Sequence, residues 1–433
     1  MTQTDNTKTL LKTVECSFLK WRDYNLNDRI TIVEDIRDRL LNNKQQYANA
    51  ITADMNKPIA QALAEIEKCA YLCDYYIENA PVFLKERKVK TGWTESAIVF
   101  RPLGVLLGVM PWNFPFWQVF RFVIPSLLVG NVFVIKHASN VPISARALEE
   151  VFNVPTINFP IYKNLPIKSN EVATVISDPI VKAVSLTGSE QAGKSVAAIA
   201  GEYLKKCVLE LGGSNAFIVM EDADLKYAVE KAVKARMQNA GQSCIAAKRF
   251  LIQESVYSTF LDLFKKELTT LKTGNKFDES VDFGAMARED LAEELEKQLN
   301  KSVLLGAKIA VGGKRNGTFF EPTIVTDVTP SMPLFREETF GPVAALMPFK
   351  NIEEAIELSN QSEFGLGVSI FTTTPEKLKP YLSLFEEGAV FINEIVVSDP
   401  HLPFGGIKNS GYGRELSEFA LHEFSNIQTV VLK

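Results

Sequence analysis

Glu210-Leu211-Gly212-Gly213 and Gly241-Gln242-Ser243-Cys244 decide the interpretation of this chain, and Cys244 follows Glu210 by 34 residues. A cysteine among small residues is free to present its thiolate as a nucleophile. Glu210 lies between apolar residues and glycines, so its carboxylate can act as a desolvated base. Upstream, Asn113 in Pro111-Trp112-Asn113-Phe114-Pro115 carries an amide that can donate to an oxyanion. These three side chains are the parts needed for covalent acyl chemistry.

Each of these residues also has a structural alternative. A free cysteine is most often a buried structural thiol. An asparagine between prolines suits a turn, and Glu210 can alternatively be a salt-bridge partner at the end of a helix. The combination of all three in one chain favours the catalytic interpretation.

Strand-like runs alternate with helical patterns along most of the chain. Apolar residues recur at helical spacing over 28–57 and 59–79, which predicts a helical layer in the N-terminal part. Strands that alternate with helices imply βαβ units and a mainly parallel sheet, so the predicted fold class is α/β. A second α/β unit begins near Gly212. The predicted strands are 105–110, 132–136, 172–176, 183–186, 216–220, 250–253, 389–392 and 429–433.

Composition excludes several classes of function. The chain has 433 residues, 46% of them hydrophobic, and a formal net charge of −5. It is long enough for two or three domains, and its acidic balance argues against a nucleic-acid partner. The most apolar stretch, 119–135, is interrupted by Arg121, Pro125 and Asn131. Because a membrane span needs about 18 or more apolar residues, we expect buried core there and no membrane partner. Residues 1–9 lack the apolar segment of a signal peptide.

Cysteine usage indicates the compartment and argues against a metal. Five cysteines without a framework spacing are typical of reduced thiols in a cytoplasmic enzyme. Cys69 and Cys73 stand one helical turn apart in a helical pattern, so we expect structural thiols rather than a metal pair. With only three histidines in the chain, a zinc site has few candidate ligands. We therefore expect no bound metal.

A third stretch, from Gly188 to Ser195, supports a different hypothesis. Gly188-Ser189-Glu190-Gln191-Ala192-Gly193-Lys194-Ser195 matches the P-loop pattern G-x-x-x-x-G-K-S between a predicted strand and a helix. A P-loop NTPase would place Lys194 on the phosphates of a nucleotide. A strand–loop–helix can equally bind the pyrophosphate of a dinucleotide at the helix N-terminus. Only the second interpretation also explains Asn113, Glu210 and Cys244, and Lys194 is then an ordinary surface lysine.

With two downstream motifs, the chain resembles the aldehyde dehydrogenase superfamily along almost its whole length. These motifs are Glu337-Glu338-Thr339-Phe340-Gly341-Pro342 and Pro403-Phe404-Gly405-Gly406. The resemblance implies a Rossmann-type cofactor domain, an α/β catalytic domain and an oligomerisation hairpin with a tail. The corresponding segments are 1–83 and 102–211 for the cofactor domain, 212–412 for the catalytic domain, and 84–101 and 421–433 for oligomerisation. A homodimer or homotetramer is expected.

The resemblance also assigns the catalytic roles. Cys244 attacks the aldehyde, Asn113 and the Cys244 backbone N–H hold the oxyanion, and Glu210 activates the water that cleaves the thioester. Relatives that pass the acyl group to coenzyme A commonly lack a glutamate at the position of Glu210. Its presence therefore favours release of a free acid.

The cofactor implied by the resemblance is NAD or NADP. Lys136 is expected to bond the adenosine ribose, and the residue three positions later tunes the choice between the two cofactors. A glutamate there favours NAD, whereas this chain has the neutral Ser139, which leaves NADP open. Further residues expected to hold the cofactor are Trp112, Gly188, Ser189, Glu338 and Phe340.

The position of Arg121 in the sequence indicates the class of substrate. It stands eight residues after Asn113 in an apolar segment, where succinate semialdehyde dehydrogenases carry an arginine that contacts the substrate carboxylate. A buried arginine needs an anionic partner, and the alternative partner is a carboxylate of the protein. A second arginine found in many of these enzymes is Gln238 here. The closest resemblance is to short bacterial NAD(P)-dependent succinate semialdehyde dehydrogenases. Another aliphatic or ω-carboxy aldehyde is the alternative substrate, and a non-catalytic structural relative is a further alternative.

Overall fold

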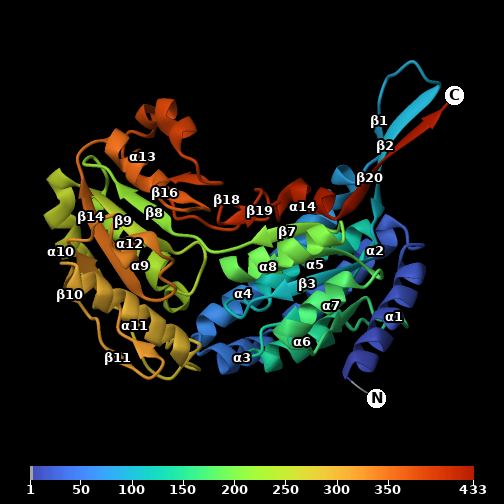
Figure 1. The fold of residues 1–433 in the computed structure, drawn as a ribbon, viewed down its shortest axis with the longest axis horizontal. Helices are drawn as coiled ribbons and strands as arrows, with labels where there is room; N and C mark the ends of the chain where they lie inside the picture. The colour runs from blue at the N-terminus through green and yellow to red at the C-terminus, as the bar shows by residue number, and fades with distance from the viewer. Residues whose placement is uncertain (1–2) are drawn as a thin grey trace.

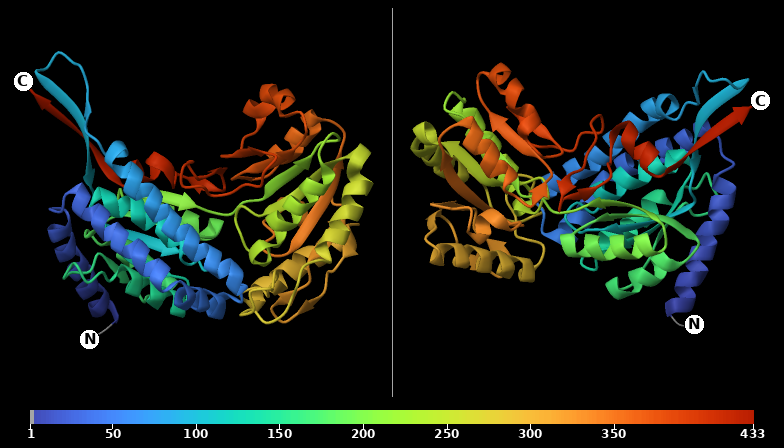
Figure 2. Two further views of the ribbon diagram at one scale, coloured as in Figure 1. Left: turned by 180° about the vertical axis from the view of Figure 1, so that it is seen from behind. Right: turned by 45° about the horizontal axis from the view of Figure 1, so that its top comes forward.

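The computed structural model describes residues 3–433 as two α/β lobes and a projecting arm (Figure 1). Each lobe holds a twisted, mostly parallel sheet with its own hydrophobic core. Two further views show the lobes joined by crossing segments, with the arm leaving the first lobe (Figure 2). Residues 1–2, the start of the predicted cofactor domain 1–83, lie outside the described residues. The α/β fold class predicted from the sequence is confirmed.

The first lobe begins with the expected helical layer. The predicted helical stretch 28–57 is divided at Asn43, where one helix ends and the next begins. Its first helix starts with a capping box between Asn25 and Asp28, which satisfies free N–H groups of the first turn. The helices of this lobe are α1 (Gln3–Trp21), α2 (Leu26–Asn42), α3 (Lys44–Met55), α4 (Ile59–Phe83), α5 (Trp117–Val129), α6 (Pro142–Phe152), α7 (Val172–Ser177), α8 (Glu190–Glu202) and α14 (Ser417–Glu423).

The first sheet has the strand order β19-β7-β6-β3-β4-β5. All its pairs are parallel except β19 with β7. The chain runs outward from β3 through β4 to β5 and then returns to the other side of β3 with β6. The order therefore reverses between β3 and β6, which is where such sheets bind ligands at the carboxyl ends of their strands. The strands are β3 (Val105–Met110), β4 (Val132–His137), β5 (Tyr162–Asn164), β6 (Val181–Thr187), β7 (Lys206–Glu210) and β19 (Gly411–Tyr412).

One predicted strand is wrong. Residues 172–176 form helix α7 rather than a strand. Their buried side chains are Val172, Val175 and Ile176, which share one face at helical spacing. A 3-10 turn leads into this helix, with Glu171 accepting from the Lys168 backbone N–H at 2.8 Å. In so short a run, apolar residues alone do not separate a buried strand from a buried helix.

The second lobe carries a seven-stranded sheet in the order β10-β13-β14-β9-β8-β16-β17. Only the edge pair β10–β13 is antiparallel. The strands are β8 (Asn215–Val219), β9 (Ala247–Gln253), β10 (Lys308–Val311), β13 (Thr323–Thr326), β14 (Val343–Phe349), β16 (Val368–Phe371) and β17 (Val390–Ile392). The helices are α9 (Leu225–Met237), α10 (Tyr257–Leu268), α11 (Glu289–Leu304), α12 (Pro333–Arg336) and α13 (Ile352–Asn360). Short pairs are β11 (Arg315–Asn316) with β12 (Phe319–Phe320), and β15 (Phe364–Gly365) with β18 (Ile407–Lys408).

The arm is a three-stranded antiparallel sheet that carries the C-terminus to its tip (Figure 1). Its strands are β1 (Arg87–Lys88), β2 (Glu95–Pro102) and β20 (Ser425–Leu432). The predicted strand 429–433 thus begins four residues earlier and pairs with β2 along its whole length. Its apolar side chains Ile427, Val430, Val431 and Leu432 are exposed.

No helix within residues 3–433 is both long and apolar enough to span a bilayer. The predicted domain boundaries stay a prediction.

Candidate active site

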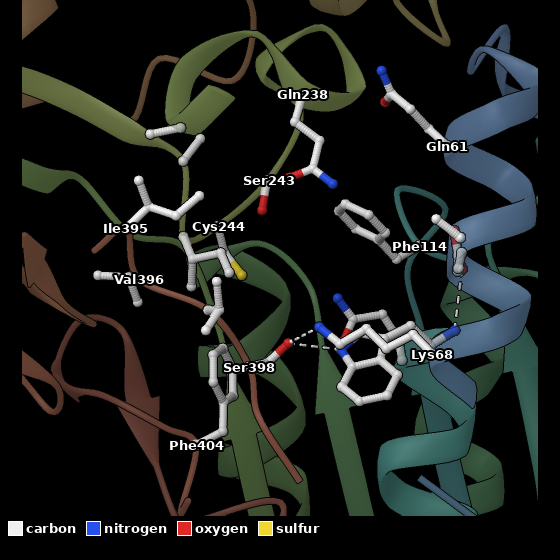
Figure 3. Close-up of a pocket in the computed structure, with 18 of the residues that line it drawn as sticks. Gln61, Lys68, Phe114, Gln238, Ser243, Cys244, Ile395, Val396, Ser398 and Phe404 are labelled. Atoms are coloured by element: carbon white, nitrogen blue, oxygen red, sulfur yellow. Dashed lines mark hydrogen bonds between the residues drawn. The ribbon is translucent and has the colours of Figure 1, made fainter. Parts of the chain in front are cut away.

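A cavity of about 230 Å³ lies between the lobes and ends at Cys244 (Figure 3). Helices α4 and α5 of the first lobe form one wall, and the segments around Cys244 and Ser398 form the other. Sulfur Sγ of Cys244 points into this space (Figure 3). The volume suits a molecule of a few carbon atoms and is below the roughly 300–1,000 Å³ of drug-sized ligand sites. Its apolar lining includes Phe114, Trp117, Ile245, Ile395, Val396 and Phe404.

The loop before Cys244 has an unusual backbone. Asn239, Ala240 and Gly241 all have positive φ, at 54°, 51° and 72°. A Cβ at Gly241 would lie 2.4 Å from the Gly341 carbonyl oxygen, so only glycine fits there. The non-glycine residues in this left-handed region carry strain that the surrounding contacts must hold. Strain of this kind concentrates at functional sites, which agrees with a loop that presents a nucleophile.

Asn113 meets the same loop, although it lies far away in the sequence. Its Nδ2 donates to the Gln242 carbonyl oxygen at 3.2 Å, and its own carbonyl oxygen accepts from Asn239 Nδ2 at 2.9 Å. Asn113 is buried at 5% exposure. The structure therefore brings the predicted oxyanion donor and the predicted nucleophile to one place.

The surroundings of Cys244 act in opposite directions on the pKa of its thiol. Burial raises the pKa of Cys244 to about 11, while Arg121 and Lys248 lower it. Lys248 is fully buried behind the loop, and its Nζ donates at 2.9 Å to the carbonyl oxygens of both Ser243 and Cys244. This lysine thus holds the two peptide groups on either side of the Cys244 Cα, the first of which carries the Cys244 N–H.

Glu210 ends strand β7 and is buried at 2% exposure. Burial raises its pKa well above the ordinary value of a carboxyl group, and the nearby Glu415 raises it further. Its Oε1 has no hydrogen-bond partner among the described residues. This direction agrees with the desolvated setting expected from the apolar residues around Glu210 in the sequence. Glu210 is not among the residues that line the Cys244 cavity.

Arg121 has a protein partner as well as a place in the cavity wall. It projects from α5, and its Nε lies 2.5 Å from Glu415 Oε2 in a buried ion pair. Its guanidinium also stacks over the Phe404 ring at 4.5 Å. Yet Arg121 Nη2 is buried and has no acceptor within residues 3–433. The protein carboxylate expected as the alternative partner is Glu415, and substrate binding by Arg121 stays a prediction.

The predicted cofactor residues gather at the carboxyl edge of the first sheet. Trp112 follows β3 and Gly188 follows β6, on the two sides of the point where the strand order reverses. Ser189 is the N-cap of α8, with its Oγ accepting from the Ala192 N–H at 3.3 Å. Lys136 lies within β4, and burial lowers its pKa. Ser139 follows β4 and is exposed.

Glu338 and Phe340 reach the site from the second lobe. Glu338 Oε1 accepts from the Gly213 N–H at 3.0 Å and lies 3.4 Å from Lys248 Nζ. A Cβ at Gly212 would lie 2.3 Å from Glu338 Oε2, so the Gly-Gly pair makes room for this carboxylate. Phe340 meets Trp112 edge to face, with ring centroids 5.7 Å apart.

The lysine of the P-loop pattern points into solvent. Lys194 is exposed, and it pairs with Glu190 one turn earlier on α8. A phosphate-binding lysine would instead have to reach back over the loop. Its surface position is the one expected under the dinucleotide interpretation.

Within residues 3–433, no three or more His, Cys, Asp or Glu residues gather as a candidate metal site.

The sequence analysis missed several residues that build the site. Glu415 and Lys248 are fully buried charges that face Arg121 and the Cys244 loop. Arg236 donates through Nη2 to the carbonyl oxygens of Thr339, at 2.7 Å, and Gly341, and so ties the Phe340 segment to α9. Lys68 on α4 reaches the cavity from the predicted helical layer. A single charged residue in an otherwise apolar stretch was the only signal for these residues, and it does not identify a partner.

The chain matches the aldehyde dehydrogenase family over residues 2–430. It is 45% identical to the succinate semialdehyde dehydrogenase [NAD(P)+] of Escherichia coli, over 98% of this chain and 93% of that protein. It is 46% identical to a probable succinate-semialdehyde dehydrogenase [NADP(+)] of Synechocystis, over 91% of this chain and 87% of that one.

Solved structures agree with these sequence relationships. The succinic semialdehyde dehydrogenase of Streptococcus pyogenes, solved in complex with NADP+, superposes with a TM-score of 0.95 at 36% identity, covering 98% of this chain and 94% of that one. The resemblance drawn from the motifs and the aldehyde dehydrogenase-like fold are both confirmed. On its sequence, its fold and the meeting of Asn113 with the Cys244 loop, the chain belongs to the aldehyde dehydrogenase family.

Proposed function

We propose that the protein oxidises an aldehyde to a carboxylic acid with NAD+ or NADP+, and that its substrate is succinate semialdehyde. The observation that carries this proposal is the cavity itself, which ends at a cysteine beside an amide donor and has an unpartnered arginine donor in its wall. The names of the relatives support the same substrate. Another aliphatic or ω-carboxy aldehyde remains the alternative.

Two residues carry the first half of the reaction. Cys244 releases its thiol proton to bulk solvent and forms a bond from Sγ to the aldehyde carbon. The carbonyl oxygen becomes an oxyanion, which Asn113 Nδ2 and the Cys244 backbone N–H stabilise by about 3 kcal/mol per donor. The bound nicotinamide supplies a hydride acceptor for the hydrogen on that carbon. The acyl group is left on Cys244 as a thioester.

Glu210 carries the second half. Its carboxylate takes a proton from a water molecule, whose oxygen attacks the thioester carbon. The carbon–sulfur bond breaks, Cys244 Sγ recovers a proton, and the carboxylic acid leaves. A buried glutamate with a raised pKa is suited to hold a proton near neutral pH and to release it again.

The carboxyl edge of the first sheet fits a dinucleotide. Thr187 Oγ1, at the end of β6, is buried and has no partner among the described residues. Lys136 Nζ donates only a long 3.5 Å bond to Ser169 Oγ. Thr187 lies two residues before the exposed N-cap of the thirteen-residue helix α8, whose first turn attracts phosphate, and Lys136 lies at the same edge of the sheet. Lys136, Ser139, Gly188 and Ser189 would hold the adenosine half, and Trp112, Glu338 and Phe340 the nicotinamide half.

Ser139→Glu should shift cofactor preference toward NAD+. A carboxylate at this exposed position can accept from the ribose 2′-hydroxyl and repels a 2′-phosphate. We expect the ratio of kcat/KM for NAD+ over NADP+ to rise about tenfold or more, as for one charge-assisted hydrogen bond. Ser139→Gln keeps the length without the charge and should shift the ratio much less. If both variants keep the wild-type ratio, Ser139 does not face the ribose.

Arg121→Ala tests the identity of the substrate. If Arg121 binds the far carboxylate, kcat/KM for succinate semialdehyde should fall about 10- to 150-fold. Butanal has a similar length and no carboxylate, so it should lose much less. Steady-state kinetics on both substrates measures this difference.

Glu415→Gln is the matched control for Arg121, because it breaks the same ion pair from the other side. If Arg121 serves the substrate, this variant should keep the preference for succinate semialdehyde over butanal. A purely structural arginine predicts instead that both variants lose activity on both aldehydes alike, since each leaves one buried charge unpaired.

The arm supports the proposal that copies of the chain associate. In the single chain, Ile427, Val430, Val431 and Leu432 of the arm's edge strand β20 are exposed. Exposed apolar side chains along an edge strand are typical of interaction surfaces. A homodimer or homotetramer stays the expected assembly.

A further inference from the structure

The charges around the Cys244 cavity are unevenly balanced. Four ionisable side chains other than the cysteine line it: Glu65, Lys68, Arg121 and Lys234. Both carboxylate oxygens of Glu65 already have partners within the protein. Its Oε2 pairs with Lys57 Nζ at 2.5 Å, and its Oε1 accepts from the backbone N–H groups of Phe116 and Trp117. The charge of Arg121 is balanced by Glu415. The two remaining charged side chains are Lys68 and Lys234, and Lys234 is exposed to solvent, which screens its charge.

Lys68 is the less exposed of these two lysines and is partly buried. Its Nζ donates to Ser398 Oγ at 2.8 Å and lies 4.1 Å from the centre of the Trp117 ring. Within residues 3–433, no carboxylate comes within ion-pair distance of it, whereas Lys234 is exposed at the same cavity. An ammonium group has three donors, and only one of them is used here. Burying such a group without an anion is costly.

Ser398 is oriented by its neighbours in a way that also suits an anion. Its Oγ accepts from Lys68 Nζ and, at 3.0 Å, from Trp117 Nε1. A hydroxyl oxygen has two acceptor positions, so both are occupied and only its O–H donor remains. Figure 3 shows Lys68 and Ser398 on the side of the cavity away from the Gln238–Ser243 segment. Free donors and an unpaired cation therefore converge at this end.

We propose that Lys68 is a specificity-determining residue that binds the far carboxylate of a short ω-carboxylated aldehyde whose carbonyl group lies at Cys244. The proposal rests on the proposed aldehyde oxidation and deepens it. Arg121 contributes its free Nη2 donor, and Lys68 contributes the positive charge that Arg121 shares with Glu415. An aldehyde without a carboxylate makes no use of Lys68.

The test compares succinate semialdehyde with butanal in four proteins: wild type, Lys68→Met, Lys68→Arg and Lys234→Met. Lys68→Met keeps the length of the side chain and removes the charge. We expect it to lower the kcat/KM ratio of succinate semialdehyde over butanal by roughly tenfold or more, mainly through KM. Lys68→Arg should restore most of the ratio. Lys234→Met removes an exposed, solvent-screened charge and should change the ratio by no more than about twofold.

The pH dependence of the same ratio gives a second readout in the unmodified protein. Burial and the neighbouring Arg121 lower the pKa of Lys68 to about 8, and Cys69, Glu65 and Asp399 act in the opposite direction. Lys68 is charged below this pKa, so the ratio should fall as the pH rises through about 8. Effects on Cys244 and Glu210 act on both aldehydes and cancel. In Lys68→Arg, whose charge persists, the ratio should stay flat over that range.

The possible results separate this proposal from the proposed function. If wild type oxidises no aldehyde with either cofactor, the proposed function itself is wrong. If wild type oxidises both aldehydes but Lys68→Met keeps the wild-type ratio, or loses both activities equally, the role of Lys68 is overturned while aldehyde oxidation stands. If Lys68→Met fails to fold, a wild-type ratio that stays constant over the whole pH range in which the enzyme is active overturns it instead.

Discussion

Replacing Cys244 with alanine should abolish aldehyde oxidation. Without Sγ no covalent bond to the aldehyde carbon can form, and we expect turnover to fall by at least about 10⁴-fold. The cofactor should still bind, because the residues expected to hold it follow β3, β4 and β6 of the first sheet or come from the Glu338 segment. Reduced-nicotinamide formation measures the first effect, and a cofactor titration measures the second.

Cys207→Ala is the matched control for this experiment. Cys207 is also a partly buried free thiol, and burial raises its pKa to about 11, as it does for Cys244. It lies on β7 and does not line the cavity, so its variant should turn over normally. Near-wild-type turnover in Cys244→Ala would contradict the cysteine mechanism. So would an ATPase activity that Lys194→Ala removes, because that result would favour the NTPase hypothesis.

Glu210→Gln should separate the two halves of the reaction. Acyl transfer to Cys244 needs the thiol and Asn113, whereas hydrolysis needs the base. We expect steady-state turnover to fall about 10²- to 10⁴-fold, while the first reduced cofactor still forms. Intact-mass spectrometry during turnover should find the acyl group on Cys244. Unchanged turnover with only free enzyme in the mass spectrum would reject this role.

The pH dependence of the wild-type protein is a second test of the role of Glu210 as the base in thioester hydrolysis. Burial raises the pKa of Glu210 well above its usual range, so this carboxyl stays protonated at pH values where an exposed glutamate is charged. A protonated carboxyl cannot accept a proton from water. Thioester hydrolysis should therefore speed up as the pH rises through this raised pKa. Glu210→Gln has no such group and should lose this part of the profile.

Much of the catalytic centre could be predicted because its parts lie in short, distinctive motifs. The sequences around Asn113, Glu210 and Cys244 each combine a reactive side chain with glycines or prolines that dictate the local backbone. Alternating strands and helices indicated the parallel sheets, because two parallel strands need a crossover connection between them, which is usually a helix. The one wrong strand, 172–176, was short enough for its apolar residues to suit either structure.

The partners of the buried charges could not be predicted. Arg121 and Glu415 meet only because α5 and the segment before α14 pack together, and nothing local to either residue records this contact. Lys68 had no signal beyond its place in a helical pattern. Its importance follows from a count of charges around a cavity, and the cavity exists only after the two lobes come together. The left-handed backbone at Asn239 and Ala240 is likewise imposed by tertiary contacts.

The most direct test of the central claim is a product measurement with the purified wild-type protein. Succinate semialdehyde is supplied with NAD+ and with NADP+ in parallel, and succinate and reduced cofactor are both quantified. We predict that one succinate and one reduced cofactor form for each aldehyde consumed, with at least one of the two cofactors. Consumption of no aldehyde with either cofactor, or reduced cofactor without the free acid, would contradict the account.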